Sequence, residues 1–153
     1  MTRFVARYEI AVSARADAIG ALLGDLAAWP LLFQRIERVE PLLERPSELL
    51  ARIWAHGPSG LSDLTCRCTR PPGAQGLLLR AVVTRPPLSD LGVRWEAAPT
   101  GPAESLVAVT YEFRVIGDAP TTALRVEREL ARLSDWDLNS VKELAELDGV
   151  AGD

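Results

Sequence analysis

The spacing of apolar residues changes twice near the start of the chain, and each change predicts a new element. From Thr2–Val12 every second residue is apolar, which predicts a strand with one buried face. Over residues 15–26 the apolar spacing becomes three or four residues, which predicts a helix with Ser13 as its N-cap. Pro30 can open a second short helix over Trp29–Phe33, because the first turn of a helix does not need its missing amide hydrogen.

After these two helices the pattern becomes that of short strands separated by turns rich in Pro and Gly. The predicted strands are Ile36–Glu44, Glu48–His56, Leu61–Thr69, Gly76–Thr84, Leu91–Ala97 and Ser105–Ile116. Tight turns between them indicate an antiparallel meander, since βαβ units would need a helix between each pair. A final helix is predicted from Pro120 to about Leu147, with Gly149 just past its end.

A lone long helix must bury its apolar stripe, and the concave face of the sheet is the available partner. We therefore expect an α+β fold: a curved seven-stranded antiparallel sheet around a long C-terminal helix, with two short helices after the first strand. Such a sheet encloses a cavity between itself and the helix. The pattern shows no linker or repeat, so residues 1–153 are expected to form a single domain, with 148–153 as a frayed tail.

Composition removes several classes of function. The net charge of −4 gives no basic surface for a nucleic acid, and the apolar runs stay short of the roughly 20 residues that span a bilayer. We therefore expect neither a nucleic-acid nor a membrane partner. With two cysteines and no export signal, the expected location is cytoplasmic. A single histidine, His56, is too little for a metal site, and no cofactor is expected.

The long helix carries an acid within its apolar stripe. Asp137 lies four residues after Leu133 and four before Val141, so all three are expected on one face. A buried carboxylate is expensive unless it is paired, and its pKa should be raised. Asp137 either caps a backbone group or reaches a basic strand residue, or it faces the cavity as part of a functional site.

Alternation along the strands selects further inward positions. Leu64, Cys66 and Cys68 share one face of their strand, and the charges on the other face make theirs the inner one. Two such thiols serve either as small core residues or, with a basic neighbour, as nucleophiles. Tyr111 and Phe113 also point inward, and a buried tyrosine hydroxyl needs a partner or a ligand.

Two further strands give a weaker signal. On Glu48–His56, Trp54 shares a side with Arg52 and His56, and either face could be the inner one. Trp95 is expected either to line the cavity or to serve as plain core.

Several of these pieces resemble the bacterial aromatic polyketide aromatase/cyclases, which share the helix-grip fold of START and Bet v 1-like domains within the SRPBCC superfamily. The segment Asp25–Phe33 (DLAAWPLLF) is similar to the family's D-x-x-x-W-P-x-x-F, and the order of strands, the chain length and the stretch Asp137–Val141 are similar too. The resemblance implies antibiotic (polyketide) biosynthesis. In the reaction that the resemblance implies, an acyl carrier protein presents a poly-β-ketone. The enzyme closes this chain into a ring by aldol condensation and dehydrates it, without a cofactor.

The chain also departs from that family. Where members carry Ser-x-Arg on the inward strand, credited with polarising a substrate oxygen, this chain has Cys66-Arg67-Cys68, with Arg67 expected outward. An inward position that is His in some members is Tyr111 here, and the family's helix acid is matched by Asp137. The chain therefore either runs a modified cyclisation with Asp137 as base and Tyr111 as acid, or it has lost the activity.

Three functions remain open at this point: a polyketide cyclase of the lyase type, a carrier or sensor of a hydrophobic molecule, and a protein that stabilises a biosynthetic complex. For the enzyme, the candidate catalytic residues are Asp137, Tyr111, Cys66 and Cys68. The candidate residues for binding the apolar substrate are Trp29, Phe33, Trp54, Leu64, Trp95, Phe113, Leu133 and Val141.

Overall fold

The computed structural model describes residues 2–71 and 75–151, the last four by their backbone alone. Its strands are β1 (Phe4–Val12), β2 (Ile36–Arg45), β3 (Glu48–Gly57), β4 (Gly60–Thr69), β5 (Gly76–Ala81), β6 (Leu88–Gly101) and β7 (Glu104–Val115). Its α-helices are α1 (Ala16–Gly24), α2 (Trp29–Leu32) and α3 (Pro120–Ala151), and its 3-10 turns are η1 (Leu26–Ala28) and η2 (Ile116–Asp118).

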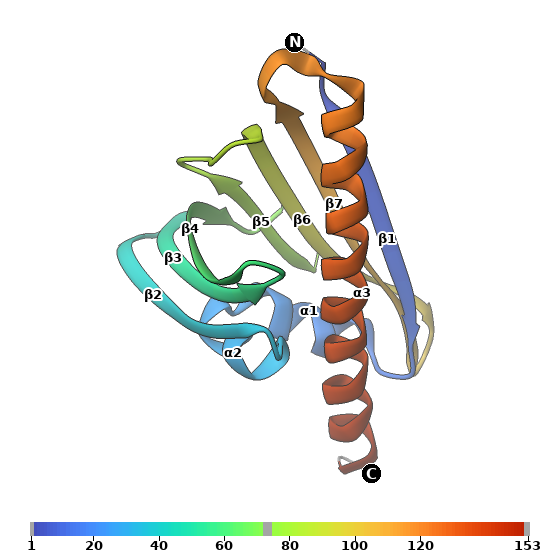
Figure 1. The fold of residues 1–153 in the computed structure, drawn as a ribbon. Helices are drawn as coiled ribbons and strands as arrows, with labels where there is room; N and C mark the ends of the chain where they lie inside the picture. Colours follow the sequence, from blue (N-terminus) through green and yellow to red (C-terminus); the bar gives the residue numbers. More distant parts are fainter. Residues whose placement is uncertain (1, 72–74, 152–153) are drawn as a thin grey trace.

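The strands form one seven-stranded antiparallel sheet in the order β1-β7-β6-β5-β4-β3-β2. The strands from β2 to β7 follow one another as a meander, and β1 closes the order by pairing with β7. The predicted fold class, a curved antiparallel sheet with a long C-terminal helix and short helices after the first strand, is confirmed (Figure 1).

The long helix α3 lies against β1 and β7, while α1 packs on β5 and β6 and α2 on β2 (Figure 1). Residues of the sheet's inner face and of the helices form one buried cluster, from Ala6 of β1 to Ala145 of α3. At most 1% of the surface of Phe33, Val107 and Val141 is exposed to solvent. This core fixes the strands and α3 around the inner face of the sheet, where the candidate site lies.

Several boundaries differ from those that the pattern predicted. Ser13 does not cap α1, because Arg15 holds the N-cap position. The backbone N–H of Ser13 donates to Glu146 Oε1 at 3.2 Å. The strand β5 ends at Ala81, and β6 is longer than expected because it continues through Pro99 to Gly101. The helix α3 runs past Gly149 to Ala151, and residues 152–153 of the expected tail lie outside the described range.

One glycine is required by the packing of the sheet beside the site. An added Cβ at Gly76 would lie 1.8 Å from the carbonyl oxygen of Trp95, which real side chains never approach so closely. Gly76 therefore lets the start of β5 pack against β6 at the position where Trp95 turns inward.

Candidate functional site

A cavity of about 150 Å³ lies between the inner face of the sheet, α2 and α3. Its walls come from side chains that are far apart in the sequence. They are Trp29, Phe33, Arg35, Ile36, Ile53, Ala55, Leu64, Leu79, Leu91, Val93, Trp95, Tyr111, Leu130, Leu133 and Asp137. The lining is apolar except for one arginine, one aspartate and one tyrosine, as in a small-molecule site with few polar groups.

Three aromatic rings form one wall of the cavity. The ring centroids of Trp29 and Phe33 are 4.8 Å apart, and those of Phe33 and Trp95 are 4.9 Å apart, with tilted or edge-on planes. The indole N–H of Trp29 donates to the Leu23 carbonyl at 3.0 Å, so its one polar group is satisfied inside the protein. Each aromatic pair adds about 0.5–1.5 kcal/mol beyond the burial of its area, which makes this wall rigid.

The polar end of the cavity is an ion pair between Arg35 and Asp137. Arg35 Nε donates to Asp137 Oδ1 at 2.8 Å and Nη2 donates to Oδ2 at 2.9 Å, a bidentate geometry. The exposed fraction is 18% for the Arg35 side chain and 5% for Asp137. Burial raises the pKa of Asp137, and the Arg35 guanidinium lowers it only in part.

Arg35 is held at this position by hydrogen bonds on both sides of it. The Ser140 hydroxyl, one turn after Asp137 on α3, donates to the Leu32 carbonyl at 2.8 Å and accepts from the Gln34 N–H at 2.9 Å. The Arg35 carbonyl accepts from the N–H of His56 at 2.8 Å. The segment between α2 and β2 is thus fastened to both α3 and β3, which limits the positions that the guanidinium can take.

Tyr111 completes the polar groups of the lining. It is 6% exposed, and its ring packs edge-on against Tyr8 with centroids 6.2 Å apart. Burial, reinforced by the charge of Asp137, raises the pKa of Tyr111, so its hydroxyl is a neutral donor at physiological pH. The inward orientation that alternation predicted for Tyr111 is the one observed.

The two cysteines point inward but lie away from the cavity lining. Cys66 and Cys68 are 0% and 2% exposed, and their Sγ atoms are 3.5 Å apart as free thiols. The contact with Cys68 together with burial raises the pKa of Cys66, so it stays a protonated thiol. Arg67 between them faces outward, where its Nε lies 3.5 Å from Glu48 Oε1.

Three expected substrate contacts do not line the cavity: Trp54, Phe113 and Val141. Trp54 lies on the outer face, with the Arg38 guanidinium 4.8 Å from its ring, because Ala51, Ile53 and Ala55 are the inward residues of β3. Phe113 is buried but stacks on Phe4 at 5.5 Å.

Val141 is fully buried in the core without reaching the cavity. By contrast, Trp29, Phe33, Leu64, Trp95, Leu133, Tyr111 and Asp137 all contribute to its lining. The charged lining residue that sequence reasoning missed is Arg35. It lies in a turn, where alternation does not predict the direction of a side chain, and its position shortly after the Trp-Pro segment was the only available signal.

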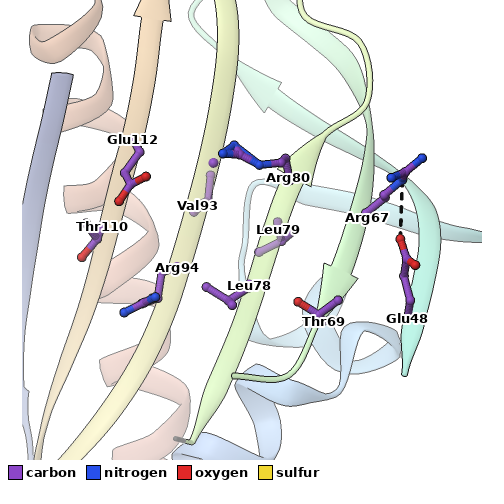
Figure 2. Close-up of a pocket in the computed structure, with 11 residues that line it drawn as sticks. Glu48, Arg67, Thr69, Leu78, Leu79, Arg80, Val93, Arg94, Thr110 and Glu112 are labelled. Atoms are coloured by element: carbon purple, nitrogen blue, oxygen red, sulfur yellow. Dashed lines mark ion pairs between the residues drawn. The ribbon is translucent and has the colours of Figure 1, made fainter. Parts of the chain in front are cut away.

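A second hollow, of about 460 Å³, lies on the outer face of the same sheet. Figure 2 shows its residues projecting from β3 to β7, including Arg80, Arg94 and Glu112, with the Arg67–Glu48 ion pair at one end. His56 is also on this outer side, exposed, with Nε2 3.8 Å from Glu37. The outer hollow is larger, but its charged groups are solvated, so we take the inner cavity as the candidate site.

Among the described residues no cluster of three or more His, Cys, Asp or Glu could hold a metal ion. Within the same part of the chain, none of the helices is both long and apolar enough to span a membrane.

No family model matches the chain. It is 28% identical over 144 residues to the actinorhodin polyketide synthase bifunctional cyclase/dehydratase of Streptomyces coelicolor, a match that covers 94% of this chain and 43% of that protein. It is 25% identical over 139 residues to the granaticin polyketide synthase bifunctional cyclase/dehydratase of Streptomyces violaceoruber, covering 91% and 43%. The chain therefore spans less than half the length of the curated relatives that it matches.

Solved structures of aromatase/cyclases superpose on this chain. The di-domain ARO/CYC BexL superposes with a TM-score of 0.85 at 26% identity, over 94% of this chain and 47% of that one. The aromatase/cyclase ZhuI from a Streptomyces species superposes with a TM-score of 0.82 at 24% identity, over 95% and 94%. A START superfamily protein of Mycobacterium smegmatis shares the fold, with a TM-score of 0.78 at 16% identity over 94% and 97%. The chain is thus a homologue of the polyketide synthase cyclase/dehydratases, built on the START/Bet v 1-like fold of the aromatase/cyclases.

Proposed function

We propose that this chain is a polyketide cyclase/aromatase domain that closes a ring in a poly-β-ketone by aldol condensation and dehydration. The observation that carries the proposal is the Arg35–Asp137 pair at the end of an apolar cavity that also contains Tyr111. A base, a cation and a neutral hydroxyl donor are the groups that an aldol reaction needs. The homology to cyclase/dehydratases supports the same chemistry.

In this proposal Asp137 is the general base. Its carboxylate removes a proton from the carbon between two carbonyl groups, and the electron pair left behind spreads over the two oxygens of the enolate. Arg35 stabilises the negative charge on those oxygens, as preorganised donors do in a dry site, which is worth about 3 kcal/mol in typical enzymes. Arg35 thereby supplies a cation to a cavity to which β4 contributes Leu64 and no charged group.

Tyr111 is the proton donor to the second reacting group. The enolate carbon attacks a ketone carbon further along the substrate, one carbon–carbon bond forms, and the ketone oxygen takes the proton of the Tyr111 hydroxyl. The protonated Asp137 restores the phenol as the product leaves. For dehydration, Asp137 removes a second α-proton while the new hydroxyl departs as water with a proton from Tyr111. These steps only move protons and form or break bonds within the substrate, so the proposal includes no cofactor.

The aromatic wall has a separate task in the proposal. Trp29, Phe33 and Trp95 present flat apolar faces on which a folded chain can pack, and fixing one conformer accelerates ring closure by proximity. Cys66 and Cys68 act as core rather than as nucleophiles in this proposal, since both side chains are buried and neither lines the cavity. That the chain forms a single domain stays a prediction. That an acyl carrier protein is its partner also stays a prediction, and the carrier would present the substrate chain as a thioester.

The test is a product assay in which the protein is added to a reconstituted polyketide synthase that makes a reactive poly-β-ketone. We expect the wild type to shift the spontaneous mixture toward one cyclised product. Tyr111→Phe should reduce that product by about 10²-fold, the usual contribution of a general acid, and Asp137→Asn should abolish it. Trp54→Phe on the outer face is the matched aromatic control and should leave the product unchanged.

A non-catalytic carrier of a hydrophobic molecule is the second candidate. It is favoured by the cysteines that replace Ser-x-Arg on β4, because they leave that strand without a charged group at the inner face. An unchanged product mixture, together with saturable binding of an aromatic ligand, would favour the carrier over the enzyme.

A further inference from the structure

The two cysteines of the chain lie together in the core and take no part in the proposed chemistry. Cys66 and Cys68 are two residues apart on β4, so both side chains point to the inner face of the sheet. Their Sγ atoms are 3.5 Å apart, and both are free thiols that are at most 2% exposed. Two sulfurs that converge in this way can both bond to one further atom.

The surroundings of the thiols do not suit the metal ions that sulfur commonly binds. Structural zinc takes four protein ligands, and residues 2–71 and 75–151 contain no group of three or more His, Cys, Asp or Glu that could hold an ion. A soft monovalent cation between two thiolates would leave a negative complex in the core, and a buried unpaired charge is costly. The residues opposite the cysteines on β3 and β5 are all apolar: Leu49, Ala51, Leu79 and Ala81.

Trivalent arsenic fits two thiols in an apolar environment. It forms three covalent bonds, so an arsenical with one organic substituent can bond both sulfurs and supply its third ligand itself. The complex is uncharged and needs no cation beside it. The contact with Cys68 together with burial raises the pKa of Cys66, so the pair holds the protons that the leaving hydroxyls of the arsenical take up.

A disulfide is the other product that two thiols can form, and the strand opposes it. Residues two apart on a strand have Cα atoms about 6.6 Å apart, close to the upper end of the roughly 4.4–6.8 Å range of disulfides. The thiolate that must attack in disulfide chemistry is also disfavoured by the raised pKa of Cys66. An arsenic atom between the sulfurs spans a gap that a direct bond between them closes only with strain.

The neighbours of the thiols indicate which substituent fits. Leu64, two residues before Cys66 on the same face, lines the inner cavity, and so does Leu79, the partner of Cys68 on β5. At about 150 Å³ this cavity has the size of an engineered apolar cavity that binds benzene, so it has room for about one ring. β4 also pairs with β5 over a shorter stretch than with β3, so local opening between β4 and β5 gives a route to the thiols.

We propose that Cys66 and Cys68 form a dithiol site for a trivalent arsenical that carries one apolar substituent of about one ring. Two S–H bonds and two As–O bonds break, two As–S bonds form, and both hydroxyls leave as water with the thiol protons. Arsenic stays trivalent, so the step needs neither an oxidant nor a reductant. This inference is independent of the proposed cyclase activity.

The experiment uses phenylarsine oxide, which hydrates in water to an arsenical of this kind. Native mass spectrometry should show one phenylarsenic group per folded chain, and both thiols should be lost, because the chain has only two cysteines. The adduct should be reversed by 2,3-dimercaptopropanol and not by the same concentration of 2-mercaptoethanol. Arsenous acid should bind at least about tenfold more weakly, because its third hydroxyl would be buried without a partner.

Variants assign the sulfurs. Cys66→Ala and Cys68→Ala each leave one thiol, and loss of the second bond should weaken binding by about 10²-fold or more. Arg67→Gln is the matched control, since Arg67 lies between the two cysteines and faces outward, and it should bind like the wild type. Circular dichroism checks the fold of each variant, and Cys→Ser replaces an alanine variant that does not fold.

Thermal unfolding shows whether the folded chain is the form that binds. A ligand of the folded state raises Tm, whereas one that prefers the unfolded chain lowers it. We expect phenylarsine oxide to raise the Tm of the wild type and to leave that of either alanine variant unchanged. A lower Tm of the wild type would overturn the inference. So would the absence of an adduct, wild-type affinity in either alanine variant, reversal by the monothiol, or equal binding of arsenous acid.

Discussion

The two faces of the sheet carry ion pairs of opposite character. On the inner side, Arg35 and Asp137 are 18% and 5% exposed and lie at 2.8 Å among apolar walls. On the outer side, Arg67 and Glu48 are 66% and 34% exposed and lie at 3.5 Å beside a larger hollow (Figure 2). Both pairs join residues distant in the sequence. They differ in how far solvent reaches their charged side chains.

That difference indicates at which of the two pairs the charges can polarise a bound ligand strongly. Water and salt screen the outer pair, which therefore contributes little to stability and would polarise a ligand weakly. The inner pair has lost most of its water, so each of its members depends on the other and acts strongly on any group placed between them. A small cavity with buried charges is therefore a stronger candidate site than a larger hollow with exposed ones.

The largest expected effect comes from breaking the inner pair on one side. Arg35→Gln removes the cation that pairs with the buried Asp137 carboxyl, and we expect the free energy of unfolding at neutral pH to fall by about 3–5 kcal/mol. Urea denaturation monitored by tryptophan fluorescence measures it. The double variant Arg35→Met/Asp137→Leu is the control and should lie within about 1 kcal/mol of the wild type or above it. Equal losses in the single and double variants would contradict this account.

An intermediate effect is expected from pH. The folded-state pKa of Asp137 is raised above its ordinary value of 3.8, so the folded protein holds this proton more tightly than the unfolded chain. Its contribution to stability is therefore complete below about pH 3.8 and is lost as the pH rises through the folded-state pKa. Relative to Asp137→Asn, the wild type should become less stable with rising pH, by at most about 1.4 kcal/mol per unit. Urea midpoints at several pH values test this, and a difference that grows in the opposite direction would refute it.

The fold was accessible from the sequence because burial on one face imposes a period on each strand. Alternation placed Tyr111, Cys66 and Cys68 on the inner face, and the structure agrees. It did not resolve β3, where arginine and tryptophan share one side, because a tryptophan can be covered by arginine side chains as well as by a core. The boundary of β5 was also missed, since the end of a strand depends on its neighbour's hydrogen bonds.

The site was accessible only in part. Asp137 stood out because a carboxylate in an apolar helical stripe is costly and needs a reason. Its partner, Arg35, did not stand out, because the side-chain direction of a turn residue is set by tertiary contacts, such as the donation of Arg35 Nη1 to the His56 carbonyl at 3.5 Å. Which inward residues line the cavity and which fill the core, as with Phe113 and Val141, depends on packing that no single-strand pattern encodes.

The smallest effect is expected on the outer face. Arg67→Gln removes one member of an exposed pair, so the free energy of unfolding should change by about 0.5 kcal/mol or less, and the change should shrink further in high salt. The same denaturation experiment measures it, with Glu48→Gln as the matched variant from the other side. The product pattern in the cyclase assay should also be unchanged, because the pair faces away from the inner cavity. A loss in Arg67→Gln as large as that in Arg35→Gln would mean that charge at the outer hollow is coupled to the core, and the contrast between the two faces would then fail.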